Sequence, residues 1–209
     1  MPHEHPDLRS IVAILRGVAP ERAVVVGKVI FEAGISTIEV PLNSPRPFDS
    51  IAKLSAALGA SCLCGAGTVL DAGDVRRAHD AGARLIVSPN TNAAVIEAAV
   101  ERRMIAMPGF ATATEAFAGI DAGAGHLKLF PAASYGPGHL KALKAVLPKD
   151  VGVYAVGGVG ADSVEDWVAA GAAGFGFGSE LFRPDYTEDD IACRARRLVE
   201  AVRCAPQKI

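Results

Sequence analysis

Short apolar runs recur along the chain and alternate with alanine-rich segments that have helical spacing. The runs are rich in Val, Ile, Leu and Phe, and neighbouring run ends are 19 to 26 residues apart. Each run ends at a proline, a glycine or a charged residue, namely Arg16, Pro41, Gly65, Pro89, Pro108, Pro131, Gly157 and Gly178. Runs of this length and composition predict eight buried strands.

The segments between the runs predict helices that end at glycine. Several of them close with Ala-Gly a few residues before the next run. A glycine at that position can adopt the left-handed conformation in which many helices end. We expect clear helices over residues 20–33, 71–81, 112–122 and 163–170.

Eight strand–helix units with short connections favour parallel strands, either closed into a barrel or open as a doubly wound sheet. The nearly equal spacing favours closure. The first run is followed by R-G-V-A-P and not by the G-x-G-x-x-G of an open dinucleotide-binding sheet. We therefore predict an α/β protein with one domain over residues 1–209, a (β/α)8 TIM barrel, preceded by a short N-terminal lead over residues 1–7.

The composition predicts a soluble globular protein. Half of the 209 residues are apolar, and 21 Lys and Arg stand against 23 Asp and Glu, a formal net charge of -2. This balance gives no basic field that would attract nucleic acid or an anionic membrane. The start lacks the apolar core of a secretory signal, and no run approaches the roughly 20 residues of a membrane helix. We expect a cytoplasmic protein with reduced, partly buried thiols at Cys62, Cys64, Cys193 and Cys204.

Two charged residues interrupt the apolar alternation of the predicted strands. Glu39 stands in I-E-V, and Lys128 stands in L-K-L. Because neighbouring side chains of a strand point to opposite faces, the apolar residues should face the helices and the charged ones the barrel interior. Burial makes an amine easier to deprotonate, and a neutral amine attacks carbonyl groups. The pair suggests imine chemistry, although a buried Lys–Glu pair can also be purely structural.

Other candidates stand at the carboxyl ends of the strands, where such barrels carry their active sites. Arg16 suits a substrate carboxylate, and Thr68 follows a Gly-Ala-Gly turn. The turns Gly157-Gly158 and Gly178-Ser179 offer backbone amides to a phosphate group. The simpler interpretations are a surface arginine and glycines that only form turns. His3 and His5 have no neighbours that complete a metal set, so we predict no metal site.

Seven motifs together resemble the KDPG/KDPGal aldolases. They are I-V-A-I-L-R-G at 11–17, I-E-V-P-L-N-S-P at 38–45, G-A-G-T-V at 65–69, S-P-N at 88–90, L-K-L-F-P-A at 127–132, A-V-G-G-V at 155–159 and G-S at 178–179. The resemblance runs from about residue 8 to residue 203. It implies a class I aldolase without metal or other cofactor, a homotrimer, which cleaves a phosphorylated 2-keto-3-deoxy sugar acid to pyruvate and D-glyceraldehyde 3-phosphate.

The resemblance also implies roles for individual positions. Lys128 matches the imine-forming lysine and Glu39 the acid–base residue. Arg16 and Thr68 match groups that hold the carboxylate end, and Pro89 matches a residue that shapes the pyruvate pocket. The positions that match the phosphate site are Gly157, Gly158, Gly178 and Ser179.

Two positions bear on the substrate. Glucose-series members usually have threonine where this chain has Val156, and a threonine-arginine segment where it has Leu42-Asn43-Ser44. The resemblance therefore favours the galactose-series substrate, 2-dehydro-3-deoxy-6-phosphogalactonate. The gluconate epimer, 4-hydroxy-2-oxoglutarate and action on both epimers stay open. Two further alternatives are a phosphosugar isomerase or synthase barrel that forms no imine, and a phosphate-binding barrel without activity.

Overall fold

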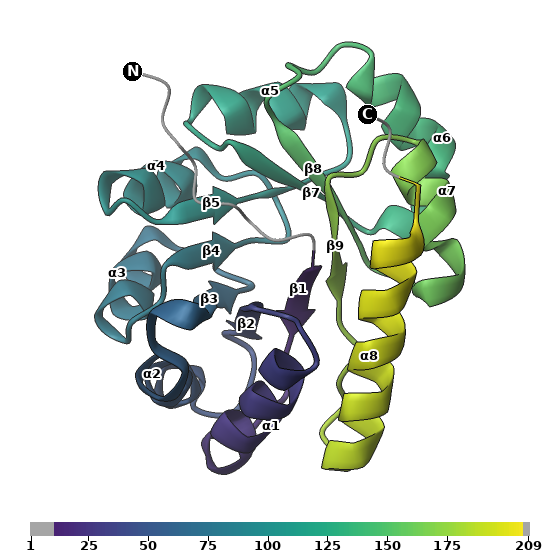
Figure 1. The fold of residues 1–209 in the computed structure, drawn as a ribbon. Helices are drawn as coiled ribbons and strands as arrows, with labels where there is room; N and C mark the ends of the chain where they lie inside the picture. Colours follow the sequence, from purple (N-terminus) through teal and green to yellow (C-terminus); the bar gives the residue numbers. More distant parts are fainter. Residues whose placement is uncertain (1–10, 207–209) are drawn as a thin grey trace.

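A computed structural model describes residues 11–206 of the chain. Its parallel strands form a nearly closed barrel, with helices between successive strands and around the outside (Figure 1). This arrangement confirms the predicted single-domain (β/α) barrel. The predicted N-terminal lead, residues 1–7, lies outside the described residues.

The sheet of the described chain has nine strands, not the eight expected. They are β1 (Ile11–Ile14), β2 (Thr37–Pro41), β3 (Leu63–Gly67), β4 (Leu85–Val87), β5 (Ile105–Met107), β6 (Gly109–Phe110), β7 (His126–Leu129), β8 (Gly152–Val156) and β9 (Gly174–Phe177). The order across the sheet is β5-β4-β3-β2-β1-β9-β8-β7-β6.

The additional strand arises because strand pairing resumes after Pro108, where the fifth run was expected to end, so that residues 105–110 form β5 and β6. Proline has no N–H to donate to a ladder, so a strand is readily interrupted there. The first half, β5, pairs with β4, and the second half, β6, pairs with β7. The carbonyl of Pro108 accepts a hydrogen bond from the Lys128 N–H at 2.9 Å. Residues 105–110 thus close the ring, because their first half pairs with β4 and their second half pairs with β7.

Helices link successive strands. They are α1 (Pro20–Glu32), α2 (Pro47–Leu58), α3 (Ala72–Asp80), α4 (Ala93–Glu101), α5 (Ala113–Asp121), α6 (Ala132–Lys144), α7 (Val164–Ala169) and α8 (Glu188–Cys204), with 3-10 turns η1 (Gly59–Ser61) and η2 (Ala161–Ser163). The four helices singled out from the sequence agree to within one residue at each end. The glycines that follow them, Gly34, Gly82, Gly123 and Gly171, have φ between 95° and 103°, as predicted.

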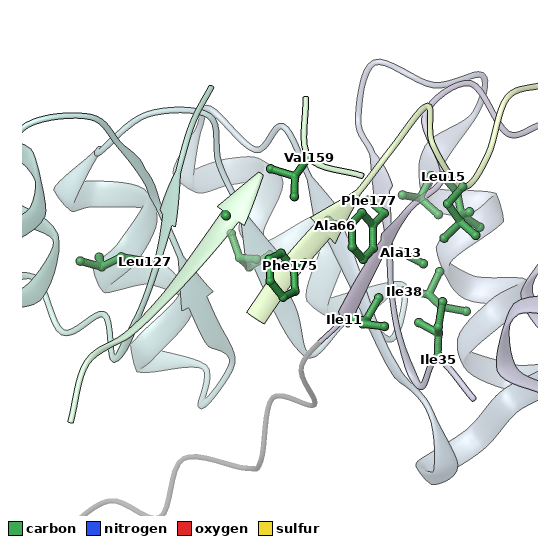
Figure 2. Packing of buried hydrophobic residues seen from close by; sticks show 14 of the residues in the cluster. Ile11, Ala13, Leu15, Ile35, Ile38, Ala66, Leu127, Val159, Phe175 and Phe177 are labelled. Atoms are coloured by element: carbon green, nitrogen blue, oxygen red, sulfur yellow. The ribbon is translucent and has the colours of Figure 1, made fainter. Parts of the chain in front are cut away.

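The strands present two different faces. Side chains on the outer face pack against the helices, among them Ala13, Ile38, Leu127, Phe175 and Phe177 (Figure 2). The alternate side chains fill the barrel interior, which contains a second apolar cluster of Val12, Ile14, Leu85, Val87, Ile105, Met107, Tyr154 and Val156. The predicted alternation is therefore confirmed, and it leaves the interior for Glu39 and Lys128.

Two of the four cysteines differ from the expectation of partial burial. Cys62 and Cys64 are buried, whereas Cys193 and Cys204 are exposed, and all four are free thiols. Cys193 and Cys204 lie on α8, whose polar face is turned to solvent. Within residues 11–206, no helix has the length and apolar character needed to cross a membrane.

Candidate active site

Glu39 and Lys128 lie inside the barrel, as their place in the strand alternation predicts. Glu39 on β2 is 1% exposed, and Lys128 on β7 is 5% exposed. In the strand registers Glu39 is opposite Gly65, and Lys128 is opposite Gly109. A Cβ atom at Gly65 would meet Leu85, and one at Gly109 would meet the Pro89 carbonyl. A Cβ atom at Gly67 would overlap the Glu39 carboxylate, so Gly67 is part of what admits Glu39.

Burial shifts the pKa values of both groups in the directions that favour their neutral forms. Loss of solvation raises the pKa of Glu39 to about 7, although the positive charges of Lys128 and Arg16 oppose this shift. Loss of solvation also lowers the pKa of Lys128; the Glu39 carboxylate opposes this shift, and Arg16 adds to it. The pair therefore holds a carboxyl group that gains and loses protons near neutral pH, beside an amine that deprotonates more easily than a surface lysine.

One oxygen of this pair has no protein partner. Oε2 of Glu39 is fully buried and accepts no hydrogen bond within residues 11–206. Buried polar atoms are nearly always hydrogen-bonded in folded proteins, so an orphaned carboxylate oxygen marks a place where function outweighs stability. Its position at the inner wall beside an amine fits a proton-transfer group.

Phe130 is a neighbour of the lysine that the sequence reasoning did not single out. Nζ of Lys128 lies 4.7 Å from the centre of the Phe130 ring. The ring face stabilises the ammonium form and covers the amine from solvent. The spacing could have indicated this contact, because Phe130 follows Lys128 by two residues and the two side chains therefore point to the same face.

The groups predicted to bind a carboxylate surround the same rim. Arg16 follows β1, is exposed, and is close enough to influence the pKa of both Glu39 and Lys128. Thr68 follows β3 with a φ of 54°, a strained value for a β-branched residue. Such strain is concentrated at functional sites. Pro89 follows β4 and its carbonyl packs against Gly109. The structure thus places all three predicted residues just after the carboxyl ends of β1, β3 and β4.

The predicted phosphate-binding turns also lie side by side. Gly157 and Gly158 follow β8, Gly178 and Ser179 follow β9, and the two strands are paired. Gly157 and Gly158 have φ of 94° and 73°, and a side chain at Gly158 would run into Ala133 of α6. Around Gly178 there is open space. The turns therefore expose backbone at a place that a bulkier residue would obstruct.

Val156, the predicted specificity position, ends β8 just below these turns. It is 4% exposed and belongs to the interior cluster. Its side chain carries only methyl groups, and a Cβ atom at Gly176 of the neighbouring strand β9 would overlap them.

Other parts of the molecule offer less chemistry. Within residues 11–206, His, Cys, Asp and Glu form no group of three that could hold a metal ion. A cavity of about 540 Å³ lies at the amino ends of β2 and β3, lined by Ser36, Cys62, Cys64 and Arg84 among others. It is at the opposite end of the strands from the rim residues described above.

Comparison with known proteins finds a family model and curated relatives that match most of the chain. The family model "KDPG and KHG aldolase" matches residues 6–195. The chain is 45% identical to the 2-dehydro-3-deoxy-6-phosphogalactonate aldolase of Escherichia coli strain K12, over 94% of this chain and 96% of that protein. It is 30% identical to the KHG/KDPG aldolase of the same bacterium, over 88% and 87%.

The solved structures agree with the fold. A structure titled "Native KDPGal structure" has a TM-score of 0.93 and 44% identity, covering 95% of this chain and 96% of that one. The family match covers nearly the whole barrel, including every strand that contributes to the rim. The chain therefore belongs to the KDPG and KHG aldolase family.

Proposed function

We propose that this chain is a class I aldolase that cleaves 2-dehydro-3-deoxy-6-phosphogalactonate to pyruvate and D-glyceraldehyde 3-phosphate. The observation that carries the proposal is the buried pair of Lys128 and Glu39, with a lowered pKa for the amine and a pKa of about 7 for the carboxyl. An amine in this state is a nucleophile, and a carboxyl in this state is both a proton donor and a proton acceptor at neutral pH.

Lys128 begins the reaction by adding through Nζ to the C2 ketone, which gives a carbinolamine. Protonation of the C2 hydroxyl by Glu39 lets water leave, and the product is an iminium ion that links C2 to the lysine. The iminium withdraws electrons from the C3–C4 bond. Phe130, whose ring centre is 4.7 Å from Nζ, restricts the amine to one side of the interior.

Glu39, now ionised, accepts the proton of the C4 hydroxyl directly or through water. The C3–C4 bond breaks, its electrons move to the iminium to form an enamine, and glyceraldehyde 3-phosphate departs as the aldehyde. Protonation of the enamine at C3 and addition of water at C2 release pyruvate and the free lysine. Glu39, with a pKa of about 7, thus serves in turn as proton donor and proton acceptor.

The rest of the rim holds the two charged ends of the substrate. Arg16 and Thr68 bind the carboxylate, Pro89 shapes the pyruvate pocket, and the amides of the turns bind the phosphate through Gly157, Gly158, Gly178 and Ser179. Contacts at both ends fix the reacting centre over Lys128, which lowers the entropic part of the barrier.

The preference for the galactonate epimer rests on Val156 and on the higher identity to the galactonate enzyme than to the KHG/KDPG enzyme of the same bacterium. The two epimers differ at C4, whose hydroxyl is the one that ionises. The methyl groups of Val156 accept no hydrogen bond, so they do not select the gluconate configuration of that hydroxyl.

We further propose a cytoplasmic homotrimer that works without metal or cofactor and has no nucleic-acid or membrane partner. The support is the absence of a metal-ligand group within residues 11–206 and the near-neutral charge of the chain. The Schiff base supplies the electron sink that a metal supplies in other aldolases, so the chemistry above is complete without one.

Borohydride trapping tests the proposal directly. With pyruvate present, borohydride should reduce the imine and add the mass of the reduced pyruvate adduct to Lys128 alone, located by peptide mass spectrometry. Lys128→Ala should lose the label and lower turnover by several orders of magnitude, while Lys144→Ala should keep both. Labelling of another lysine contradicts the role proposed for Lys128. Labelling of none contradicts imine chemistry and favours an isomerase, a synthase or a binding protein.

A coupled pyruvate assay on both C4 epimers tests the substrate. We expect a higher kcat/KM for the galactonate epimer, and a shift of the ratio toward the gluconate epimer in Val156→Thr by roughly 10-fold. Equal kcat/KM values for the two epimers contradict the assignment of the galactonate substrate and leave the aldolase assignment intact.

A further inference from the structure

The loops after β1 and β2 are joined by two hydrogen bonds made beyond the ends of the strands. Nη1 of Arg16 donates to Oδ1 of Asn43 at 2.7 Å. The N–H of Gly17 donates to Oγ of Ser44 at 2.9 Å, and Ser44 is 8% exposed. Between the strands themselves, the N–H of Leu15 donates to the Glu39 carbonyl. The two loops therefore move as one unit with the strand that carries Glu39.

Arg16 depends on this connection for its position. Its side chain is exposed, and a free arginine side chain loses rotamer entropy when it binds a ligand. The hydrogen bond to Asn43 restricts the guanidinium before a substrate arrives. Such preorganisation moves the entropy loss from binding to folding.

The partner of Arg16 is a neutral amide, which sets it apart from other arginines of the molecule. Arg22, Arg46, Arg77 and Arg197 each pair with a carboxylate. Arg16 makes no ion pair within residues 11–206, and its one side-chain hydrogen bond there leaves most of its five N–H groups available. Asn43 thus fixes the guanidinium and leaves its positive charge uncompensated.

We infer that Asn43 is a positioning residue for Arg16, which it holds in place to bind the carboxylate of a 2-oxo acid without neutralising it. The inference rests on the proposed function, since it concerns the carboxylate end of that substrate. An aspartate at position 43 would keep the acceptor oxygen and therefore the geometry, but it would pair with Arg16 and compete with the substrate carboxylate.

The test compares Asn43→Asp and Asn43→Ala by the pyruvate concentration that gives half-maximal borohydride labelling of Lys128. We expect this concentration to rise at least 10-fold in Asn43→Asp and several-fold in Asn43→Ala, with the thermal midpoint of Asn43→Asp unchanged or higher. A purely structural role predicts the opposite order, because aspartate preserves the hydrogen bond and alanine removes it.

Two controls separate the outcomes. Asn92→Asp adds the same charge at the start of α4, where the Asn92 side chain accepts a hydrogen bond from the Ala94 N–H. Half-maximal labelling of Lys128 in this variant should need the same pyruvate concentration as in the parent. In an Arg16→Ala background, neither change at position 43 should alter labelling further. If Asn43→Asp labels at the same pyruvate concentration as the parent, or if its effect persists without Arg16, the inference is overturned. If the parent enzyme itself does not label, the proposed function fails instead.

Discussion

At the scale of single residues, the site combines groups that burial makes unstable in their usual charge states. Glu39 and Lys128 are both at least nine-tenths buried, and each is further affected by Arg16. Removing a charge from water is costly unless partners compensate. Here the compensation is partial, since one carboxylate oxygen stays without a partner in the part of the chain that the structure describes. The fold thus gives up stability to bury two titratable groups, which the proposed reaction would use for proton transfer.

The stability of Glu39→Gln should reveal this cost. Burial raises the pKa of Glu39 from an ordinary 4.5 to about 7, so between these values the folded state binds more protons than the unfolded state. The contribution of Glu39 to the free energy of unfolding is therefore present below pH 4.5 and is lost as the pH rises toward 7. Glutamine does not titrate, so Glu39→Gln should be more stable than the parent by roughly 1–3 kcal/mol at pH 8.

Urea unfolding at pH 4.5, 6 and 8 measures this difference. The advantage of Glu39→Gln should grow steadily with pH across this range, while its aldol cleavage activity is largely lost. A difference that is independent of pH would show that Glu39 is not desolvated as described.

Gly67→Ala probes the space that Glu39 occupies. The added methyl group would overlap the Glu39 carboxylate, so the carboxylate must move away from Lys128. A displacement of about 1 Å at a catalytic group can lower kcat by roughly 100-fold. We expect such a loss with an unchanged far-ultraviolet circular dichroism spectrum. Activity equal to that of the parent would mean that Glu39 has room to shift without consequence.

At the scale of elements, the strand ends depend on glycine for their close approach. Gly109 begins β6 and lies directly against the backbone carbonyl of Pro89. A backbone atom cannot turn aside as a side chain does, so the loop after β4 and the start of β6 are fixed against each other. The rim is therefore assembled by backbone contacts as well as by side chains.

Gly109→Ala should destabilise the barrel. The new Cβ atom would collide with the Pro89 carbonyl, and overpacking of this kind costs about 1–3 kcal/mol, or a fall in Tm of roughly 2–12 °C for a domain of this size. Gly138→Ala in α6 is the matched control, because a Cβ there meets only open space. Its Tm should stay the same or rise slightly. Equal Tm values for the two variants in a calorimetric scan would contradict the argument.

At the scale of the whole molecule, the two ends of the barrel in the described chain differ in their chemistry. The carboxyl ends of the strands carry all the predicted site residues, and the amino ends carry the cavity lined by the two buried thiols. The exposed large apolar side chains are spread over several elements and include Val25, Leu70, Val100, Phe117, Tyr135 and Val146. A subunit interface would cover part of this apolar surface.

The proposed trimer predicts a particle of about 65 kDa, three times the chain mass of 21.6 kDa. Light scattering on a gel-filtration peak at micromolar concentration measures this mass. A particle of the single-chain mass that is fully active would contradict the proposal of a trimer.

The strand alternation was enough to place the reactive pair. In the runs I-E-V and L-K-L, apolar neighbours determine which face is buried, and the interior position of Glu39 and Lys128 follows. The helix ends were predicted equally well, because the glycine with positive φ that ends each helix closely follows it in the sequence. The division at Pro108 was missed, since a run of apolar residues does not reveal which neighbour each half will pair with.

Loop contacts were beyond the reach of the sequence. The hydrogen bond between Arg16 and Asn43 joins residues 27 positions apart, and it depends on how two strand ends lie side by side. Likewise, Nε2 of His139 lies 2.6 Å from the carbonyl of Ala111, 28 residues away. Such contacts depend on the three-dimensional arrangement of loops, which leaves no periodic trace in the chain.

The division of the strand at Pro108 has a consequence for Lys128, which lies on the neighbouring strand β7. Because β5 is bonded to β4, and β6 to β7, the ring is completed across residues 105–110. The amide of Lys128 itself spans this section, through its bond to the Pro108 carbonyl. A change that displaces the Pro108 carbonyl would therefore also displace the backbone of Lys128, so the peptide group that completes the ring also helps to position the proposed nucleophile.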